Sequence, residues 1–329
     1  MSTSTRLLEV NDLSMIYRTL QGDVKAVQNV TMHVNRGEAV GIAGESGCGK
    51  TSFASSIIQI LPRVAKIQSG EIKFRGVDML GLSKEQFRKQ YRWKKISYIF
   101  QGAMNALNPI IKVGDQIAET ITLHENVSEE EAWERGARLF EMVGLEPGRI
   151  NNYPFEFSGG MRQRAMIAMA LACNPELVIA DEPTTALDVT IQAQIMELLK
   201  HLQETLDLSF ILITHDISVI AETCNRAIIM YGGKIAEIAS VDDVFGNPFH
   251  PYSEGLIGAI PSMEKAKEKM LTHIPGAPPN LINPPSGCLF HTRCPYAKPR
   301  CQQEVPEVRE VIPGRFVACH YVDESGFNQ

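Results

Sequence analysis

Apolar and polar residues change their spacing along the chain, and these changes predict where strands and helices lie. Short runs in which apolar and polar residues alternate occupy residues 6–43 and predict β-strands. From about residue 103 to 175 the apolar residues recur every three to four positions, which predicts helices. Continuous apolar runs follow at 177–180 and 210–213, and such runs are typical of parallel strands covered on both faces. The pattern predicts an α/β core with an all-helical insertion.

The composition changes after about residue 245. Residues 272–287 contain five prolines and two glycines in sixteen residues. Such a segment is too rigid and too poor in N–H donors for a helix or a central strand. We therefore expect a main domain over residues 1–245, with its helical subdomain at about 103–175, and a C-terminal extension over residues 246–329.

Charge and hydropathy exclude some classes of protein. The chain has 329 residues, of which 44% are hydrophobic and 21% charged, as is ordinary for a globular protein. Its formal net charge of -6 argues against a nucleic-acid binder, which normally carries a basic surplus. No apolar run approaches the roughly 18 residues that a membrane-spanning helix needs, and residues 1–13 lack the apolar segment of a secretory signal. We expect a cytoplasmic protein that touches membranes through partners.

A glycine-rich segment connects the apolar run at 39–43 to a segment with helical spacing at 51–61. It reads GESGCGKT and matches the phosphate-binding P-loop pattern G-x4-G-K-[ST]. The glycines let backbone N–H groups point at phosphates, Lys50 would reach the β- and γ-phosphates, and the Thr51 hydroxyl would contact Mg²⁺. A chance glycine-rich turn is the alternative. The expected nucleotide-binding residues of this segment are Gly44, Glu45, Ser46, Gly47, Cys48, Gly49, Lys50, Thr51 and Ser52.

Two adjacent carboxylates end the apolar run at 177–180. Asp181 and Glu182 form the Walker B pattern, and unpaired charge at the end of a buried strand is costly unless a cation meets it. Asp181 fits a residue that holds Mg²⁺, and Glu182 fits a general base or water-positioning residue for attack on a γ-phosphate. An exposed acidic turn is the alternative.

A serine followed by two glycines opens the predicted helix after residue 158. Such a start exposes N–H groups that bind anions, whereas its simpler interpretation is a helix capped by serine. The segment reads FSGGMRQR and, together with the P-loop, resembles the LSGGQ signature of ATP-binding cassette (ABC) proteins, with Phe157 for Leu and Met161 for Gln. The resemblance implies a P-loop NTPase core of the ABC type with an antiparallel β subdomain and a helical insertion.

The resemblance extends to the other segments that bind ATP in this family. It implies that Gln101 is the Q-loop glutamine, which meets Mg²⁺ with Thr51 and Asp181, and that His215 is the switch histidine near the γ-phosphate. It places Tyr17 where the family stacks an aromatic ring on adenine, although a single aromatic residue in a strand is more often part of a core. Asp188 matches the D-loop. The signature residues would serve the ATP of a partner cassette, and they are Ser158, Gly159, Gly160, Met161, Arg162 and Gln163.

The resemblance narrows to one branch of ABC importers. The signature region, IFQGAMNALNP at 99–109 and FGNPFHPYSEGLIGAIP at 245–261 are similar to the first of two ATPase subunits in dipeptide, oligopeptide and nickel importers. This implies ATP hydrolysis at the cytoplasmic face of the membrane with a second, related ATPase, two transmembrane permease subunits and, indirectly, an extracytoplasmic solute-binding protein. Peptides, nickel chelates and oligosaccharides are substrates in such systems.

Four of the seven cysteines crowd into the last 42 residues, at spacing C-x5-C-x6-C-x17-C. Because disulfides are disfavoured in a reducing cytoplasm, Cys288, Cys294, Cys301 and Cys319 indicate a metal site. Thiolates suit zinc or an iron–sulfur centre, and unligated or disulfide-bonded cysteines are the remaining alternative. The resemblance implies a 4Fe–4S cluster, for which we expect a structural role.

Rival interpretations come from other functional classes. One is a soluble ABC-type ATPase in translation or DNA repair, but the chain shows neither a second cassette nor a coiled-coil insertion. Another is a redox sensor built on the cysteines. We expect an ATPase subunit of an ABC importer.

Overall fold

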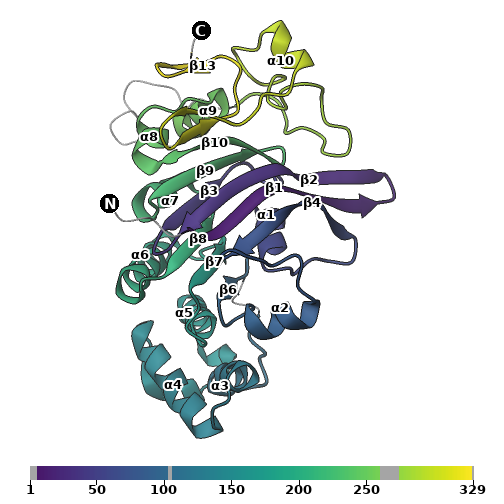
Figure 1. Ribbon diagram of the computed structural model, residues 1–329. Helices are drawn as coiled ribbons and strands as arrows, with labels where there is room; N and C mark the ends of the chain where they lie inside the picture. Colours follow the sequence, from purple (N-terminus) through teal and green to yellow (C-terminus); the bar gives the residue numbers. More distant parts are fainter. Residues whose placement is uncertain (1–5, 103–105, 260–273, 328–329) are drawn as a thin grey trace. The chain divides into compact units, whose positions relative to one another are not determined.

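The computed structural model describes residues 6–102, 106–259 and 274–327, and the chain forms two compact units. Both units combine segments that are far apart in sequence (Figure 1). Three predicted segments lie partly outside the described residues, namely the start of the helical insertion at 103–105, the end of the extension motif at 260–261 and residues 272–273 of the proline-rich segment. The first unit consists of Met1–Leu7, Val34–Glu38 and Val77–Leu212, and the second of Leu8–His33, Ala39–Gly76 and Ile213–Gln329.

Three neighbouring strands of the first unit are fully buried, as the continuous apolar runs predict. They lie in the order β8-β7-β6, with β6 and β7 parallel. Their bounds are β6 (Ile96–Ile99), β7 (Leu177–Asp181) and β8 (Ser209–Ile213). The two apolar runs at 177–180 and 210–213 are therefore confirmed as buried strands.

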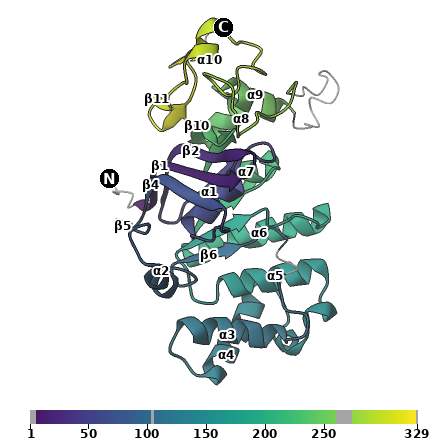
Figure 2. The same cartoon turned by 90° about the vertical axis from the view of Figure 1, so that its right-hand side faces the viewer.

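The helical insertion is also confirmed. Helices α3 and α4 pack side by side (Figure 2) through apolar faces that include Ile117, Ile121, Leu139 and Phe140. The ring of Phe140 meets that of Phe157 edge-on. The remaining elements of the unit are β5 (Val77–Asp78), α2 (Lys84–Gln90), α3 (Val113–His124), α4 (Glu129–Met142), η2 (Pro147–Asn151), η3 (Pro154–Glu156), α5 (Gly159–Ala170) and α6 (Val189–Leu206).

The second unit contains the alternating strands predicted near the start of the chain. Strands β1 (Arg6–Thr19) and β2 (Gly22–Asn35) are each 14 residues long, and β4 (Ala65–Phe74) pairs antiparallel with β1. Their order is β2-β1-β4. Buried and accessible residues alternate along these strands, so one face of the sheet forms a core.

A second sheet of this unit joins the strand before the P-loop to the C-terminal extension. Its order is β11-β12-β10-β9-β3, with β3 parallel to β9 and β12 antiparallel to β10. Its strands are β3 (Ala39–Ala43), β9 (Arg226–Tyr231), β10 (Lys234–Ser240), β11 (Arg309–Ile312) and β12 (Arg315–Val317). The boundary near residue 245 remains a prediction, and it falls inside a helix of this unit.

Short helices complete the second unit, and α8 and α9 pack near β10 (Figure 1). They are α1 (Lys50–Ile57), α7 (Ile217–Thr223), α8 (Val241–Gly246), α9 (Pro251–Gly258) and α10 (Pro299–Gln303), beside the small strand pair β13 (Val322–Asp323) and β14 (Gly326–Phe327). Among the described helices of either unit, none has the length and hydropathy to cross a bilayer.

Candidate functional site

The P-loop is the turn between the fully buried β3 and α1. Its glycines at 44, 47 and 49 have φ of 150°, 78° and 103°, a region that side chains disfavour. A Cβ on Gly44 would lie 2.2 Å from the carbonyl oxygen of Met230, and one on Gly49 would lie 2.1 Å from that of Ala26. Glycine is therefore required at both positions, and the interpretation of this segment as a chance turn is not supported.

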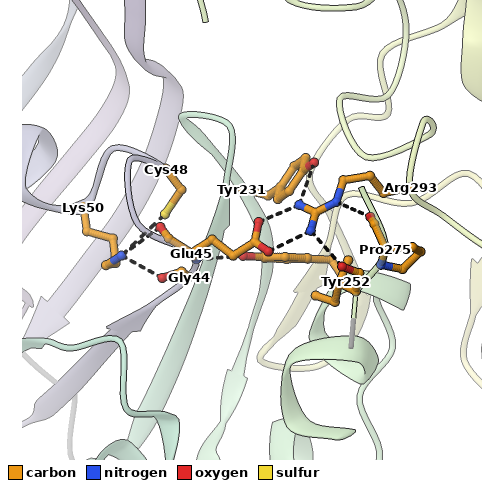
Figure 3. Close-up of polar contacts among 9 residues, drawn as sticks. Gly44, Glu45, Cys48, Lys50, Tyr231, Tyr252, Pro275 and Arg293 are labelled. Atoms are coloured by element: carbon orange, nitrogen blue, oxygen red, sulfur yellow. Dashed lines mark hydrogen bonds and ion pairs between the residues drawn. The ribbon is translucent and has the colours of Figure 1, made fainter. Parts of the chain in front are cut away.

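The start of α1 has the properties of an anion site. Gly49 is its N-cap and has no side chain to bond the first N–H groups of the helix. Lys50, only 6% exposed, donates from Nζ to the carbonyl oxygens of Gly44 (2.7 Å) and Glu45 (3.1 Å) (Figure 3). A lysine held over a ring of backbone groups at a helix start is the arrangement that binds phosphates.

Tyr17 of β1 lies beside the P-loop helix. Its hydroxyl and that of Ser52 are 3.0 Å apart and share a hydrogen bond. The expected stacking of Tyr17 on adenine remains a prediction. Cys48 is 5% exposed, and burial raises the pKa of its thiol, against the opposing effect of nearby Lys50, so the side chain stays neutral.

An arginine of the C-terminal extension contacts the P-loop, and no motif in the sequence indicates this contact. Arg293 donates from both terminal nitrogens to the Glu45 carboxylate, at 2.6 and 2.8 Å (Figure 3). Its Nε donates to the carbonyl oxygen of Pro275 at 2.8 Å, and its Nη1 lies 3.3 Å from the hydroxyl of Tyr231. The Arg293 side chain is 3% exposed, whereas that of Glu45 is 25% exposed. The backbone N–H of Glu45 donates to the hydroxyl of Tyr252 at 2.8 Å.

His215 follows β8 at the start of another helix of the second unit. The N–H of the preceding residue, Thr214, donates to the carbonyl oxygen of Ile42 in β3. Asp216 then caps α7 by accepting from the N–H of Ser218 at 3.0 Å. His215 is exposed and follows a residue that is hydrogen-bonded to the strand leading into the P-loop, and its role as a switch histidine remains a prediction.

In the first unit, the two carboxylates at the end of β7 have different surroundings. Asp181 is 1% exposed and accepts from the hydroxyl of Tyr98 at 2.8 Å. Glu182 accepts from Gln101 Nε2 at 2.8 Å and from Thr185 Oγ1 at 3.0 Å. Its φ of 47° is unusual for a residue other than glycine and is typical of functional positions. The structure thus brings Gln101 and Glu182 together, and an exposed acidic turn is wrong for the buried Asp181.

The signature segment begins a capped helix. Ser158 is the N-cap of α5 and accepts from the N–H of Met161 at 3.3 Å. A Cβ on Gly160 would lie 2.8 Å from Ile191 Cγ2, so the glycine permits close packing on α6. Asp188 likewise caps α6 by accepting from the N–H of Ile191 at 3.0 Å. The simpler interpretation of this segment as a serine-capped helix is correct, and its binding role remains a prediction.

The four late cysteines converge on one pocket of the second unit. Cys288, Cys294, Cys301 and Cys319 all line it, together with aromatic and histidine side chains. Burial raises the pKa of Cys288 to about 11 and that of Cys294 to about 12. In the described parts of the chain, however, no group of three or more His, Cys, Asp or Glu side chains is arranged to hold a metal ion. The predicted metal-binding character of the extension is not confirmed.

Comparison with family models finds two matches. Residues 27–185 match the ABC transporter family, and residues 236–301 match the C-terminal region of oligopeptide/dipeptide transporters. The second match begins in β10, upstream of the predicted boundary.

Comparison with curated proteins finds relatives along nearly the whole chain. The chain is 49% identical to the oligopeptide transport ATP-binding protein OppD of Bacillus subtilis over 306 residues. This alignment covers 92% of this chain and 85% of that protein. The chain is 48% identical to a probable peptide ABC transporter ATP-binding protein of Sinorhizobium fredii, over 95% and 94% of the two chains. It is 46% identical to OppD of Escherichia coli, over 95% and 92%.

Solved structures agree with this assignment. The ATP-binding cassette MJ0796, in a dimeric post-hydrolysis state bound to ADP and Pi, matches with a TM-score of 0.64 and 29% identity, over 71% of this chain and 98% of that one. CbiO1 of Clostridium perfringens, part of an ABC transporter complex, matches with a TM-score of 0.64 and 26% identity, over 74% and 91%. The α/β cassette fold, the P-loop and the extension all match these relatives. The chain therefore belongs to the ABC transporter ATPases, as an ATP-binding subunit of the oligopeptide and dipeptide type.

Proposed function

We propose that this chain hydrolyses ATP to drive the import of peptides through partner membrane subunits. The observation that carries the proposal is a strained, glycine-dependent P-loop in a chain whose relatives are peptide transport ATPases over more than nine-tenths of its length. The matched C-terminal region of oligopeptide/dipeptide transporters supports peptides over nickel chelates or oligosaccharides.

Each unit contributes residues with a defined chemical task. In the second unit the P-loop amides and Lys50 bind the phosphates, and His215 contacts the γ-phosphate. In the first unit Asp181 would offer a buried carboxylate oxygen to Mg²⁺, and Gln101 would offer its side-chain oxygen. Glu182, oriented by its bonds from Gln101 and Thr185, takes a proton from the attacking water or positions it. Catalysis rests on positioning and electrostatic stabilisation of the phosphoryl group.

The signature residues act on ATP held by a second cassette in a heterodimer with a related ATPase subunit. The dimeric state named for the MJ0796 cassette supports a dimer of this kind. Ser158 to Gln163 would contact that ATP, and Asp188 follows them in the D-loop. Binding of this dimer to two permease subunits places the chain at the cytoplasmic face of the membrane, with a solute-binding protein on the other side.

The function is tested by reconstituting the chain with its paired ATPase and two permease subunits in vesicles. ATP-dependent uptake of labelled peptide, abolished by Lys50→Ala, is expected. Rapid, cooperative hydrolysis by the isolated chain that the membrane subunits leave unchanged would favour a soluble ATPase instead.

We further propose that the four cysteines hold a 4Fe–4S cluster with a structural role, zinc being the alternative. Their convergence on one pocket and the softness of thiolates support this proposal.

Protein purified without oxygen should contain iron and inorganic sulfide. Zinc without iron would support a structural metal site and reject the 4Fe–4S cluster. Four free thiols in an extension that resists protease would reject both.

A further inference from the structure

Every polar group of Glu45 has a partner in the second unit. Its N–H donates to Tyr252, its carbonyl oxygen accepts from Lys50, and its carboxylate pairs with Arg293 (Figure 3). Two of these partners follow the P-loop by more than 200 positions and belong to the extension. The conformation of the second P-loop residue is therefore fixed from outside the loop.

The charge of Glu45 makes this contact relevant to nucleotide binding. A carboxylate next to Gly44 lies in a loop whose task is to attract phosphates, so an unpaired negative charge there would oppose ATP. Arg293 cancels that charge through two parallel N–H···O bonds, the strongest geometry for a guanidinium and a carboxylate. With its side chain 3% exposed, Arg293 has exchanged water for this pairing.

The segment that holds Arg293 is itself well fixed. The N–H groups of Arg293 and Cys294 both donate to the carbonyl oxygen of Phe290. The ring of Phe290 packs on those of Tyr231 and Tyr252, at centroid distances of 5.1 and 5.3 Å. These contacts hold the backbone from which the Arg293 side chain reaches Glu45.

We propose that Arg293 is a positioning residue for ATP binding, which neutralises Glu45 and holds the P-loop in its phosphate-binding form. The inference deepens the proposed ATPase function by giving the C-terminal extension a part in nucleotide affinity. It predicts a defect of electrostatic origin, which a simple anchoring role does not.

Two other ion pairs of the extension allow an anchoring role to be distinguished from this one. Arg315 pairs with Glu237 of β10 at 2.7 Å, with side chains 3% and 0% exposed, and this pair attaches the extension to the sheet. Arg300 and Glu304, at 2.7 Å, form an exposed pair of the same chemistry on the extension. These two pairs are the controls for the Arg293–Glu45 pair.

The experiment measures ATP affinity and steady-state hydrolysis of the assembled transporter. The variants are Arg293→Ala, Arg293→Lys and the double variant Arg293→Ala/Glu45→Gln, with Arg300→Ala and Glu237→Gln as the controls. Arg293→Ala should weaken ATP binding about tenfold, the scale of losing a hydrogen-bonded charge pair, while kcat at saturating ATP changes little. The double variant should regain most of the affinity because it lacks the unpaired carboxylate, and Arg293→Lys should fall between wild type and Arg293→Ala.

The outcomes separate this inference from the proposed function. Equal affinity of Arg293→Ala and wild type overturns the inference, as does a double variant that is as impaired as Arg293→Ala. A matching loss in Glu237→Gln, which loosens the extension elsewhere, would show that anchoring alone is responsible. A wild-type complex that fails to bind ATP would instead overturn the function.

Discussion

The helices α1 and α5 both begin at glycine-containing segments that the sequence marks as anion sites, yet they begin differently. At α1 the N-cap is Gly49, with φ of 103° and no side chain to bond the first N–H groups. At α5 the N-cap is Ser158, whose hydroxyl accepts from Met161. The first start has no capping side chain, whereas the second is capped by its own serine.

The difference teaches that glycine serves two purposes in these motifs. Gly49 is required by the backbone, because its φ is 103° and a Cβ there would meet the carbonyl oxygen of Ala26. Gly160 is required by packing, since its neighbour is the side chain of Ile191. The α1 start fits the proposed binding of the chain's own ATP, and the α5 start fits the proposed role toward ATP held by another subunit.

The largest effect is expected from Glu182→Gln. This variant sharpens the comparison because it separates ATP binding at α1 from ATP hydrolysis. Loss of the carboxylate should lower ATP turnover by ~10²–10⁴-fold while Mg-ATP binding persists. Single-turnover hydrolysis and nucleotide titration of the assembled transporter measure the two quantities. Unchanged turnover would remove Glu182 from its proposed role.

A matched pair of glycine variants tests the comparison directly. Gly49→Ala should weaken ATP binding about a hundredfold, because an alanine at positive φ and 2.1 Å from a backbone oxygen forces the loop to move. Gly160→Ala would press on the Cγ2 methyl of Ile191 in α6 and should leave ATP binding by the chain itself intact. Similar affinities for the two variants would break the comparison.

A third helix start, that of α9, adds a pH dependence. His250 caps α9 by accepting at Nδ1 from the N–H of Tyr252, which requires an unprotonated ring nitrogen. Burial lowers the pKa of His250 from 6.5 to about 4, against the opposing effect of Glu237. This contribution to stability is complete above about pH 6.5 and is lost as the pH falls toward 4, because the unfolded chain binds the proton more readily.

Urea denaturation at pH 7 and pH 5 should therefore show a loss of about 2 kcal/mol in unfolding free energy. His250→Asn keeps a side chain that caps helices but does not titrate, so it should remove most of this difference. An unaltered pH dependence in His250→Asn would contradict the assignment.

The smallest effect is expected from Ser158→Ala. Removing the cap of α5 should cost about 1 kcal/mol of stability, as for other serine caps. ATP binding by the isolated chain should not change, and hydrogen exchange at the start of α5 reports the loosened turn. A large loss of the chain's own ATP affinity would show that the two helix starts are less distinct than their caps indicate.

Local pattern was sufficient to predict the P-loop, the buried strands and the carboxylates that end β7. Each of these depends on neighbours in sequence, such as the glycines whose φ values the turn requires. The contact between Arg293 and Glu45 spans 248 positions, and Tyr98 meets Asp181 across 83. No spacing rule connects such residues, because their proximity comes from the packing of separate strands and loops.

The pairing of β12 with β10 has a consequence for how the chain is made. Glu237 of β10 is fully buried and accepts from Arg315 and from the N–H groups of Phe249 and His250. Arg315 follows Glu237 by 78 positions, so during synthesis β10 emerges long before its neighbouring strand and its countercharge. A nascent chain that stops near residue 250, or a gene truncated there, holds an unneutralised carboxylate at an open sheet edge. The sheet that contains β10 is therefore completed only after the ribosome has synthesised β12.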